Sequence, residues 1–389
     1  MYIEKIKSPA DLKGLDIKAL QIVADETRNA VLNRVSQHGG HVGPNLGFVE
    51  ATVALHYVFD APKDKLVFDV SHQCYPHKVL TGRAAGFLGN INDMNAISGY
   101  SSPAECPEYD NFEVGHTSTS ISLATGLQKA RDIKGTDENI IAIIGDGSLS
   151  GGEAFEGLDE ASELGTGIII VVNDNEMSIA ENHGGIYKNL RALRESNGTC
   201  AHNWFKAWGF EYKYLEEGND IEKLIKVFES VKGTDKPTVV HIHTEKGHGF
   251  APAVANKEAW HWGLPFNRLD GSRPPKPAVE TYEELFSNWM LNEMKHDPHT
   301  HCRYSRHTCG CGLHSRETQT GGQATHRHGH CRGASGGHDF GHGQGRTAPC
   351  VDGVQHFHTT HLRPNSTGHL HQRQPGRYQR GRRRCQLYE

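Results

Sequence analysis

Residues 140–178 constrain the fold more than any other part of this 389-residue chain. They contain two short apolar runs rich in β-branched side chains, residues 140–144 and 168–172. Such runs are typical of strands that are buried on both faces. Between the runs, residues 152–165 carry apolar side chains at near-helical spacing, which predicts a helix. The stretch therefore predicts a strand–helix–strand unit with parallel strands, as in an α/β sheet flanked by helices.

Two polar residues follow the two predicted strands. Asp146 stands between glycines after the first strand, and Asn175 comes directly after the second. Both then lie past the carboxyl ends of parallel strands, where open α/β sheets bind ligands. A carboxylate, an amide oxygen and nearby carbonyls suit Mg²⁺, and the backbone N–H groups from Gly147 onward can bind a phosphate. The alternative is an Asp-Gly turn followed by an Asx cap, but the 29-residue separation across a complete strand–helix–strand unit favours the metal site.

The residues around this pair resemble a known family. A GDG triplet followed at this distance by asparagine is the signature of thiamine-diphosphate enzymes. The segments GDGSLSGGEAFEGLDEA and NDNEMSI resemble the 1-deoxy-D-xylulose-5-phosphate synthase family, a relative of transketolase. The resemblance covers residues 10–296 and implies the thiamine-diphosphate-binding α/β fold, a parallel sheet flanked by helices.

The resemblance also implies the residues that hold the cofactor. Mg²⁺ would be held by Asp146, the Asn175 side chain and the Met177 carbonyl, and would in turn clamp the diphosphate of thiamine diphosphate. Gly147, Ser148 and Asn175 would lie at that diphosphate. Further cofactor contacts fall on residues in other motifs of the chain: His72, Gly115, His116, Thr117 and Phe250, the last of which replaces a family tyrosine.

Two histidines match catalytic or substrate-binding positions of the family. His41 lies in a GGH segment followed closely by NLG, and the resemblance makes it a candidate for substrate contact or proton transfer. A histidine that merely occupies a glycine loop is the alternative. His261, in AWHWGLPFN, matches a substrate-site histidine, although it could equally pack between Trp260 and Trp262.

Several local features carry further expectations. Ser71 precedes His72 where the family usually has glycine, and His77 and Lys78 match the family motif but could simply order their loop. Residues 85–113 are rich in Gly, Asn, Ser and Pro, which predicts an irregular loop. Side chains of residues 117–120 could cap a helix that continues along ISLATGLQKA.

The composition divides the chain near residue 297. Residues 1–296 hold 28 Lys+Arg and 41 Asp+Glu, a net charge of −13, whereas residues 297–389 hold 13 Arg and 5 Asp+Glu, a net of +8. The second part has fourteen of the 27 His and six of the nine Cys, and it lacks Lys, Ile, Met and Trp. We expect one cofactor-binding domain, residues 1–296, which includes a proline-rich linker at 271–280. We expect residues 297–389 to be disordered, because so few apolar side chains cannot offset the entropy of ordering.

A frameshift near residues 297–304 would explain the second part. Codons exist for residues 305–374 that, read one nucleotide later, encode strings resembling the family's second domain, with its IAEEH motif. In the family, that motif supplies the glutamate that activates the cofactor ring, but residues 330–334 read HCRGA and contain no carboxylate. A third family domain is also expected to be absent. A zinc site at His307, Cys309, Cys311 and His314 is the alternative, although its spacing is not a standard one.

The resemblance implies an enzyme that joins pyruvate to glyceraldehyde 3-phosphate with loss of CO₂, which feeds isoprenoid, thiamine and pyridoxal synthesis. The intact family is expected to form homodimers. We expect the chain as written to be inactive, and we expect no nucleic-acid or membrane partner. The start, MYIEKIKSPADLK, lacks the apolar segment of a signal peptide, which predicts a cytoplasmic protein. Two alternative hypotheses remain: the N-terminal half of a split transketolase-type enzyme, and a histidine-rich metal-binding protein.

Overall fold

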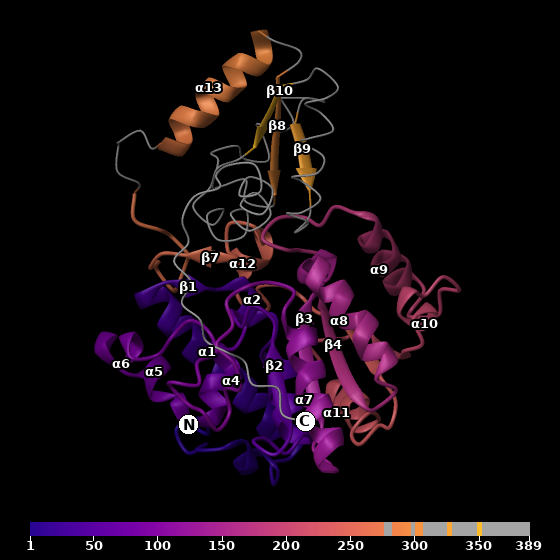
Figure 1. The fold of residues 1–389 in the computed structure, drawn as a ribbon. Helices are drawn as coiled ribbons and strands as arrows, with labels where there is room; N and C mark the ends of the chain where they lie inside the picture. The colour runs from indigo at the N-terminus through magenta and orange to yellow at the C-terminus, as the bar shows by residue number, and fades with distance from the viewer. Residues whose placement is uncertain (276–281, 297–299, 306–324, 329–347, 352–389) are drawn as a thin grey trace, which may run out of the picture.

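A computed structural model describes residues 1–275, 282–296, 300–305, 325–328 and 348–351. Its centre is a five-stranded sheet in which every neighbouring pair of strands is parallel. In sheet order the strands are β2 (Lys65–Phe68), β3 (Ile140–Gly145), β4 (Ile168–Asp174), β6 (Thr238–His243) and β5 (Glu211–Leu215). The predicted α/β class is therefore confirmed (Figure 1).

The strand–helix–strand unit forms as the apolar pattern predicted. Strands β3 and β4 pair in parallel, with Ile140 opposite Ile168, and they are joined through the short 3₁₀ helix η3 (Asp146–Ser150) and α8 (Gly152–Glu163). Every residue of β4 is buried, which explains why its sequence is apolar without alternation. Helix α8 ends two residues before the predicted end at residue 165.

Helices cover both faces of the sheet, because side chains along each strand alternate between the two faces. Ile141, Ile143 and Val171 belong to one hydrophobic cluster, with side chains of α1 (Ile17–His38), α3 (Val49–Val58) and α11 (Ile221–Glu229). Their strand neighbours Ile140, Ile144 and Val172 belong to the other cluster, with side chains of α7 (Ser120–Lys134), α8 and α9 (Gly185–Glu195). Two cores on opposite faces fix the sheet as a middle layer (Figure 1).

The remaining elements, apart from α13, are short and connect the parts of this framework. Between α1 and β3 these are β1 (Gly40–His41), α2 (Gly43–Leu46), α4 (Tyr75–Lys78), the π-helical turn η2 (Val79–Arg83), α5 (Ala85–Leu88) and α6 (Ile91–Asn95). The 3₁₀ helix η1 (Pro9–Leu12) precedes α1, and α10 (Trp204–Ala207), α12 (Ala251–Ala255), β7 (Trp262–Gly263) and α13 (Tyr282–His296) come later. Strands β1 and β7 pair in antiparallel fashion, which brings His41 opposite Trp262.

Two local expectations are wrong. Residues 85–113 are not wholly irregular, because they include α5 and α6; the Asn90 side chain caps α6 by accepting from the backbone N–H groups of Asn92 and Asp93. Helix α7 is not capped by its own side chains either. Its first amides bind a carboxylate on a different strand, about fifty residues earlier in the sequence.

Residues 297–389 are described only in part. Three strands, β8 (Thr300–Ser305), β9 (Thr325–His328) and β10 (Ala348–Val351), form a parallel sheet in the order β10-β8-β9. The predictions of disorder and of a zinc site concern residues that mostly lie outside the described ranges, and they stay predictions. Within the described part of the chain, no helix is long and apolar enough to cross a membrane.

Candidate cofactor site

A cavity of about 300 Å³ opens at the carboxyl ends of β2, β3 and β4. It collects eleven of the twelve residues that the sequence analysis assigned to the cofactor, the metal or the substrate, although their segments are spread from residue 41 to residue 261. The eleven are His41, His72, Gly115, His116, Thr117, Asp146, Gly147, Ser148, Asn175, Met177 and His261. Their meeting follows from the parallel sheet, which turns the same end of each strand toward one edge.

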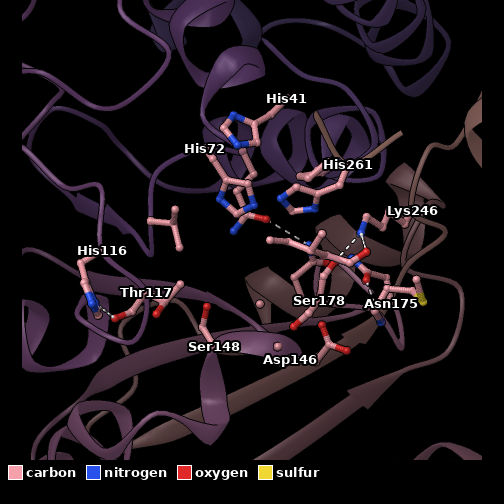
Figure 2. A pocket seen from close by; sticks show the side chains of 18 of the residues that line it. His41, His72, His116, Thr117, Asp146, Ser148, Asn175, Ser178, Lys246 and His261 are labelled. Carbon is pink, nitrogen blue, oxygen red and sulfur yellow. Dashed lines mark hydrogen bonds between the residues drawn. The ribbon is translucent and has the colours of Figure 1, made fainter. Parts of the chain in front are cut away.

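The two oxygen ligands expected for Mg²⁺ lie on adjacent strand ends. Gly145 of β3 is opposite Asn173 of β4, so that Asp146 and Asn175 emerge beside each other (Figure 2). The Asp146 carboxylate accepts a hydrogen bond from the Asn182 amide at 2.5 Å, and the Asn175 side-chain oxygen accepts one from the Met177 backbone at 3.2 Å. A carboxylate, an amide and backbone carbonyls form an oxygen-only donor set, which fits a hard cation.

The turn after β4 is strained and is held by a buried ion pair. Glu176 has a φ of +65°, in the left-handed region that non-glycine residues rarely adopt. Asp174 accepts from His241 at 2.9 Å and binds Arg194, whose other nitrogen reaches Glu176 at 3.0 Å. Burial opposes ionisation of Asp174, but the contacts with His241 and Arg194 hold its pKa well below the ordinary value. These contacts fix the backbone that presents Asn175.

Three imidazole rings form the opposite side of the cavity (Figure 2). The ring centroids of His41, His72 and His261 lie 4.9 to 5.5 Å apart. Burial, with a smaller contribution from the Lys246 charge, lowers the pKa of His41 to about 4. Burial and the neighbouring His41 and Lys246 also lower the pKa of His72 well below its ordinary value. Both rings are therefore neutral near pH 7 and can accept a hydrogen bond through the ring nitrogen that carries no proton.

Lys246 is a cavity residue that the sequence analysis did not select. Its side chain is 1% exposed, and its ammonium group donates to the Ser178 carbonyl and to the Ile179 carbonyl at 3.3 Å. The segment KGHGFAP already stood out as a motif, but only Phe250 was taken from it. The signal available in the sequence was the place of Lys246 in that motif; its burial at the cavity wall is evident only from the structure.

Phe250 is the twelfth predicted residue, and the structure does not place it among those that line the cavity. Its ring lies 5.1 Å from Trp260 and 5.7 Å from Phe266 between centroids, and the residue is 7% exposed. An aromatic ring without a polar group gains more from burial in this cluster than from contact with a polar cavity. The expected cofactor contact of Phe250 is therefore not supported by its position.

His77 and Lys78 bind acidic side chains of a neighbouring loop, which agrees with the alternative that they order a loop rather than contact the cofactor. The His77 ring donates to the Asp110 carboxylate at 3.1 Å and shares a hydrogen bond with the His56 ring at 2.9 Å, and the Lys78 ammonium donates to Glu105 at 2.8 Å. Asp110 and Glu105 belong to the segment that carries Tyr100 into the cavity wall, where its ring lies 5.8 Å from that of His41. Neither His77 nor Lys78 is among the residues that line the cavity.

Ser71 shows why glycine is usual before this histidine. Its φ is +62°, and this backbone conformation is unfavourable for any residue that has a side chain. Serine offsets this cost with two hydrogen bonds that glycine cannot make, donating to the Val114 carbonyl at 2.6 Å and accepting from the Ser101 amide at 2.9 Å. The change to serine therefore ties the loop of Tyr100 to the cavity.

Unsatisfied polar atoms near the cavity indicate a missing polar partner. Among the described residues, His72 Nδ1, Gln73 Nε2 and Ser178 Oγ are buried without a hydrogen-bond partner, and all three residues line the cavity. Buried polar groups without partners are rare, and each costs free energy. The donor set and these atoms together fit a polar, phosphate-bearing ligand held with a cation.

Comparisons with known proteins agree with this geometry. A family model described as 1-deoxy-D-xylulose-5-phosphate synthase matches residues 3–201. The chain is 38% identical to the 1-deoxy-D-xylulose-5-phosphate synthase of Desulforudis audaxviator, over 80% of this chain and 54% of that protein. It is 41% identical to the enzyme of the same name from Listeria monocytogenes, over 75% of this chain and 49% of that protein. The chain thus spans about half the length of the curated relatives it matches.

A solved structure shows the same fold at lower identity. Transketolase from Campylobacter jejuni is 17% identical and matches with a TM-score of 0.53, over 77% of this chain and 59% of that chain. At this identity the likeness concerns the fold alone.

Proposed function

The chain belongs to the 1-deoxy-D-xylulose-5-phosphate synthase family, a family of thiamine-diphosphate-dependent transferases, and on that premise we propose that its cavity binds thiamine diphosphate with Mg²⁺. The observation that carries the proposal is the meeting of Asp146 and Asn175 on adjacent strand ends of one cavity, beside buried polar atoms that lack partners.

The cation would be held by Asp146, the Asn175 side chain and the Met177 carbonyl. Mg²⁺ usually takes few protein ligands and completes its shell with phosphate and water, which suits a site with one carboxylate. The diphosphate would lie between residues 115–117 and residues 147–148. Both segments line the cavity, and their backbone N–H groups and hydroxyls suit phosphate oxygens.

The remaining cavity residues would bind the substrate. His41 is neutral at physiological pH, because its pKa is about 4, so it can accept a hydrogen bond from a substrate hydroxyl, but so low a pKa makes it a weak base for taking the proton. His261 lies 5.5 Å from it between ring centroids and can bind the same substrate. Thiamine diphosphate, when bound, supplies the carbon nucleophile of the decarboxylative step. Lys246 contributes a fixed positive charge at the wall of the cavity.

The whole-protein activity that we propose is the condensation of pyruvate with D-glyceraldehyde 3-phosphate, with loss of CO₂, to give 1-deoxy-D-xylulose 5-phosphate. This reaction feeds isoprenoid synthesis and the synthesis of thiamine and pyridoxal. We further propose a cytoplasmic homodimer for the intact form. Relatives of that name, about twice as long as the matched part, support the proposal.

We also propose that the chain as written does not complete this reaction. Residues 1–296 form the cofactor-binding domain in this proposal, and residues 297–389 are out of frame. The support is the change of composition near residue 297 and the sequence HCRGA at residues 330–334, which offers no carboxylate for the cofactor ring. Binding without an activated ring adds affinity but does not lower the barrier of the reaction.

Calorimetry tests the binding part of the proposal. Thiamine diphosphate should bind the full chain with Mg²⁺ present, and binding should be lost in the presence of a chelator and in the Asp146→Ala variant. The matched control is Asp159→Ala, which removes an exposed carboxylate on the outer side of α8. Equal affinity of the Asp146→Ala variant and the unmodified chain would contradict the metal assignment.

A coupled assay for pyruvate-dependent CO₂ release tests the catalytic part. The chain as written should give no turnover, and a frame-corrected gene that continues through the family's remaining domains should give it. Turnover by the 389-residue chain, purified free of host enzyme, would refute the frameshift proposal.

A further inference from the structure

Asp69 is a buried carboxylate at the carboxyl end of β2, and the proposed cofactor contacts do not use it. Asp69 is 1% exposed, and its backbone N–H continues the hydrogen bonding of the sheet by donating to the Ile143 carbonyl at 2.8 Å. The next residue, Val70, lines the cavity. A fully buried carboxylate so close to a site for an anion requires a structural reason.

The carboxylate binds the N-terminus of α7. One oxygen accepts from the Ser118 amide at 3.0 Å, and the other accepts from the amides of Thr119 and Ser120 at 2.8 and 3.1 Å. These are the backbone donors that a helix leaves unpaired at its start, and a negative charge there is stabilised by the helix dipole. Asp69 therefore anchors the end of the segment that carries Gly115, His116 and Thr117.

Ser118 continues the connection to a second segment of the cavity. Its φ is +75°, and its hydroxyl donates to the Ser148 carbonyl at 2.8 Å. The approach is so close that a Cβ at Gly151 would stand 1.9 Å from the Ser118 hydroxyl oxygen. Asp69 thus reaches the 3₁₀ helix η3 through Ser118, whose left-handed backbone makes this geometry possible, and also through a side-chain hydrogen bond with Ser148.

We propose that Asp69 is a positioning residue that acts through Ser118 to set the spacing between the two segments expected to hold the diphosphate, residues 115–117 and 146–148. The inference rests on the proposed cofactor. One segment precedes α7 and the other follows β3, and Asp69 joins them through Ser118, which binds the Ser148 carbonyl, and through the Ser148 side chain. A diphosphate that must touch both segments binds tightly only if their separation is already correct.

The opposite end of β2 offers a matched control. Asp64 is 3% exposed and, like Asp69, accepts backbone hydrogen bonds, from Asn139 at 2.7 Å and from Asp60 at 2.6 Å. It does not line the cavity, because it lies at the amino end of the strand. Asp64→Asn and Asp69→Asn make the same change in two buried carboxyl groups that accept backbone hydrogen bonds, and only Asp69 lies next to the proposed cofactor.

The experiment measures the affinity of the full chain for thiamine diphosphate with Mg²⁺, together with thermal unfolding. Asp69→Asn should weaken binding about tenfold, as is usual when a residue that orients ligands is changed. Asp64→Asn should lower the unfolding midpoint but leave the affinity unchanged. Ser118→Gly should weaken binding about fivefold through the lost hydrogen bond, while the unfolding midpoint is kept or raised because glycine adopts this φ without strain.

The double variant separates positioning from general destabilisation. If Asp69 acts through Ser118, the variant with both changes should bind about as weakly as Asp69→Asn alone, whereas Asp64→Asn and Ser118→Gly should combine additively. Additive losses for Asp69 and Ser118, or equal affinities of the Asp69→Asn and Asp64→Asn variants, would overturn the proposal.

Hydrogen exchange gives a readout that does not depend on the cofactor. The amides of Ser118, Thr119 and Ser120 should be protected in the unmodified chain and lose protection in Asp69→Asn. Unchanged protection would overturn the inference even if the cofactor binds. Failure of the unmodified chain to bind thiamine diphosphate would instead refute the proposed function, and the positioning role of Asp69 with it.

Discussion

Asp110 provides the sharpest test of how the cavity wall is held. The Arg83 guanidinium binds it with both terminal nitrogens, at 2.8 and 3.0 Å, and His77 and the Ser102 amide bind it at 3.1 and 2.8 Å. The Asp110 side chain is 0% exposed and that of Arg83 is 9% exposed. Burial opposes ionisation of Asp110, but the hydrogen bonds from His77 and Arg83 hold its pKa well below the ordinary value.

Asp110→Asn should be strongly destabilising. The amide has nearly the same shape, but it turns one acceptor into a donor. It also leaves the buried Arg83 charge with only the longer contact to Glu105 at 3.4 Å, a carboxylate that Lys78 already binds. Removing one partner of a buried ion pair costs about 3–5 kcal/mol, and we expect about 3 kcal/mol because the amide oxygen can still accept. For a domain of this size, that loss lowers the thermal midpoint by roughly 6–12 °C.

The control uses an exposed pair with the same separation. Lys63 and Asp137 also lie 2.8 Å apart, but their side chains are 56% and 83% exposed. Asp137→Asn should leave the midpoint unchanged, because water and salt screen exposed ion pairs. Differential scanning calorimetry of both variants gives the comparison. If Asp110→Asn lowers the midpoint no more than Asp137→Asn does, burial is not what makes this network stabilising, and the reasoning fails.

Three further predictions concern histidines, Lys246 and Phe250. Burial lowers the pKa of His56 well below 6.5, so below pH 6.5 the unfolded chain binds a proton at this ring that the folded chain does not bind. The free energy of unfolding should therefore fall as the pH is lowered from 6.5 to 5, and it should fall less steeply in His56→Gln. A free energy of unfolding that does not change with pH would contradict this. Lys246→Met should raise the pKa of His41 above about 4, which NMR titration of the ring measures; no change would show that the lysine charge does not reach it. Phe250→Ala should cost about 3 kcal/mol of unfolding free energy without weakening cofactor binding, whereas a specific loss of affinity would restore Phe250 to the cofactor site.

The local pattern of apolar and polar residues was sufficient to predict the central strands and helices of the fold. Strands β3 and β4, helix α8 and the positions of Asp146 and Asn175 could be predicted, because the apolar runs are local and both faces of a central parallel strand are buried. The same holds for α1, α11 and β6: the apolar pattern predicts helices at about residues 16–37 and 220–232 and a strand at residues 238–243, and the observed bounds lie within three residues of these. The meeting of the cavity residues followed from parallel topology and from the resemblance of the motifs.

Partners far apart in the chain were decided only by the tertiary structure. Nothing in the residues near Ser118 indicates that Asp69 caps their helix, because the N-terminus of a helix accepts any correctly placed carboxylate. Phe250 lies in an aromatic cluster because Trp260 and Phe266 are brought to it by the fold. The local sequence pattern indicates which side chains are buried and which secondary structure the backbone adopts. Which distant residue each side chain contacts depends on how segments far apart in the sequence pack together, and this is decided only when the whole chain has folded.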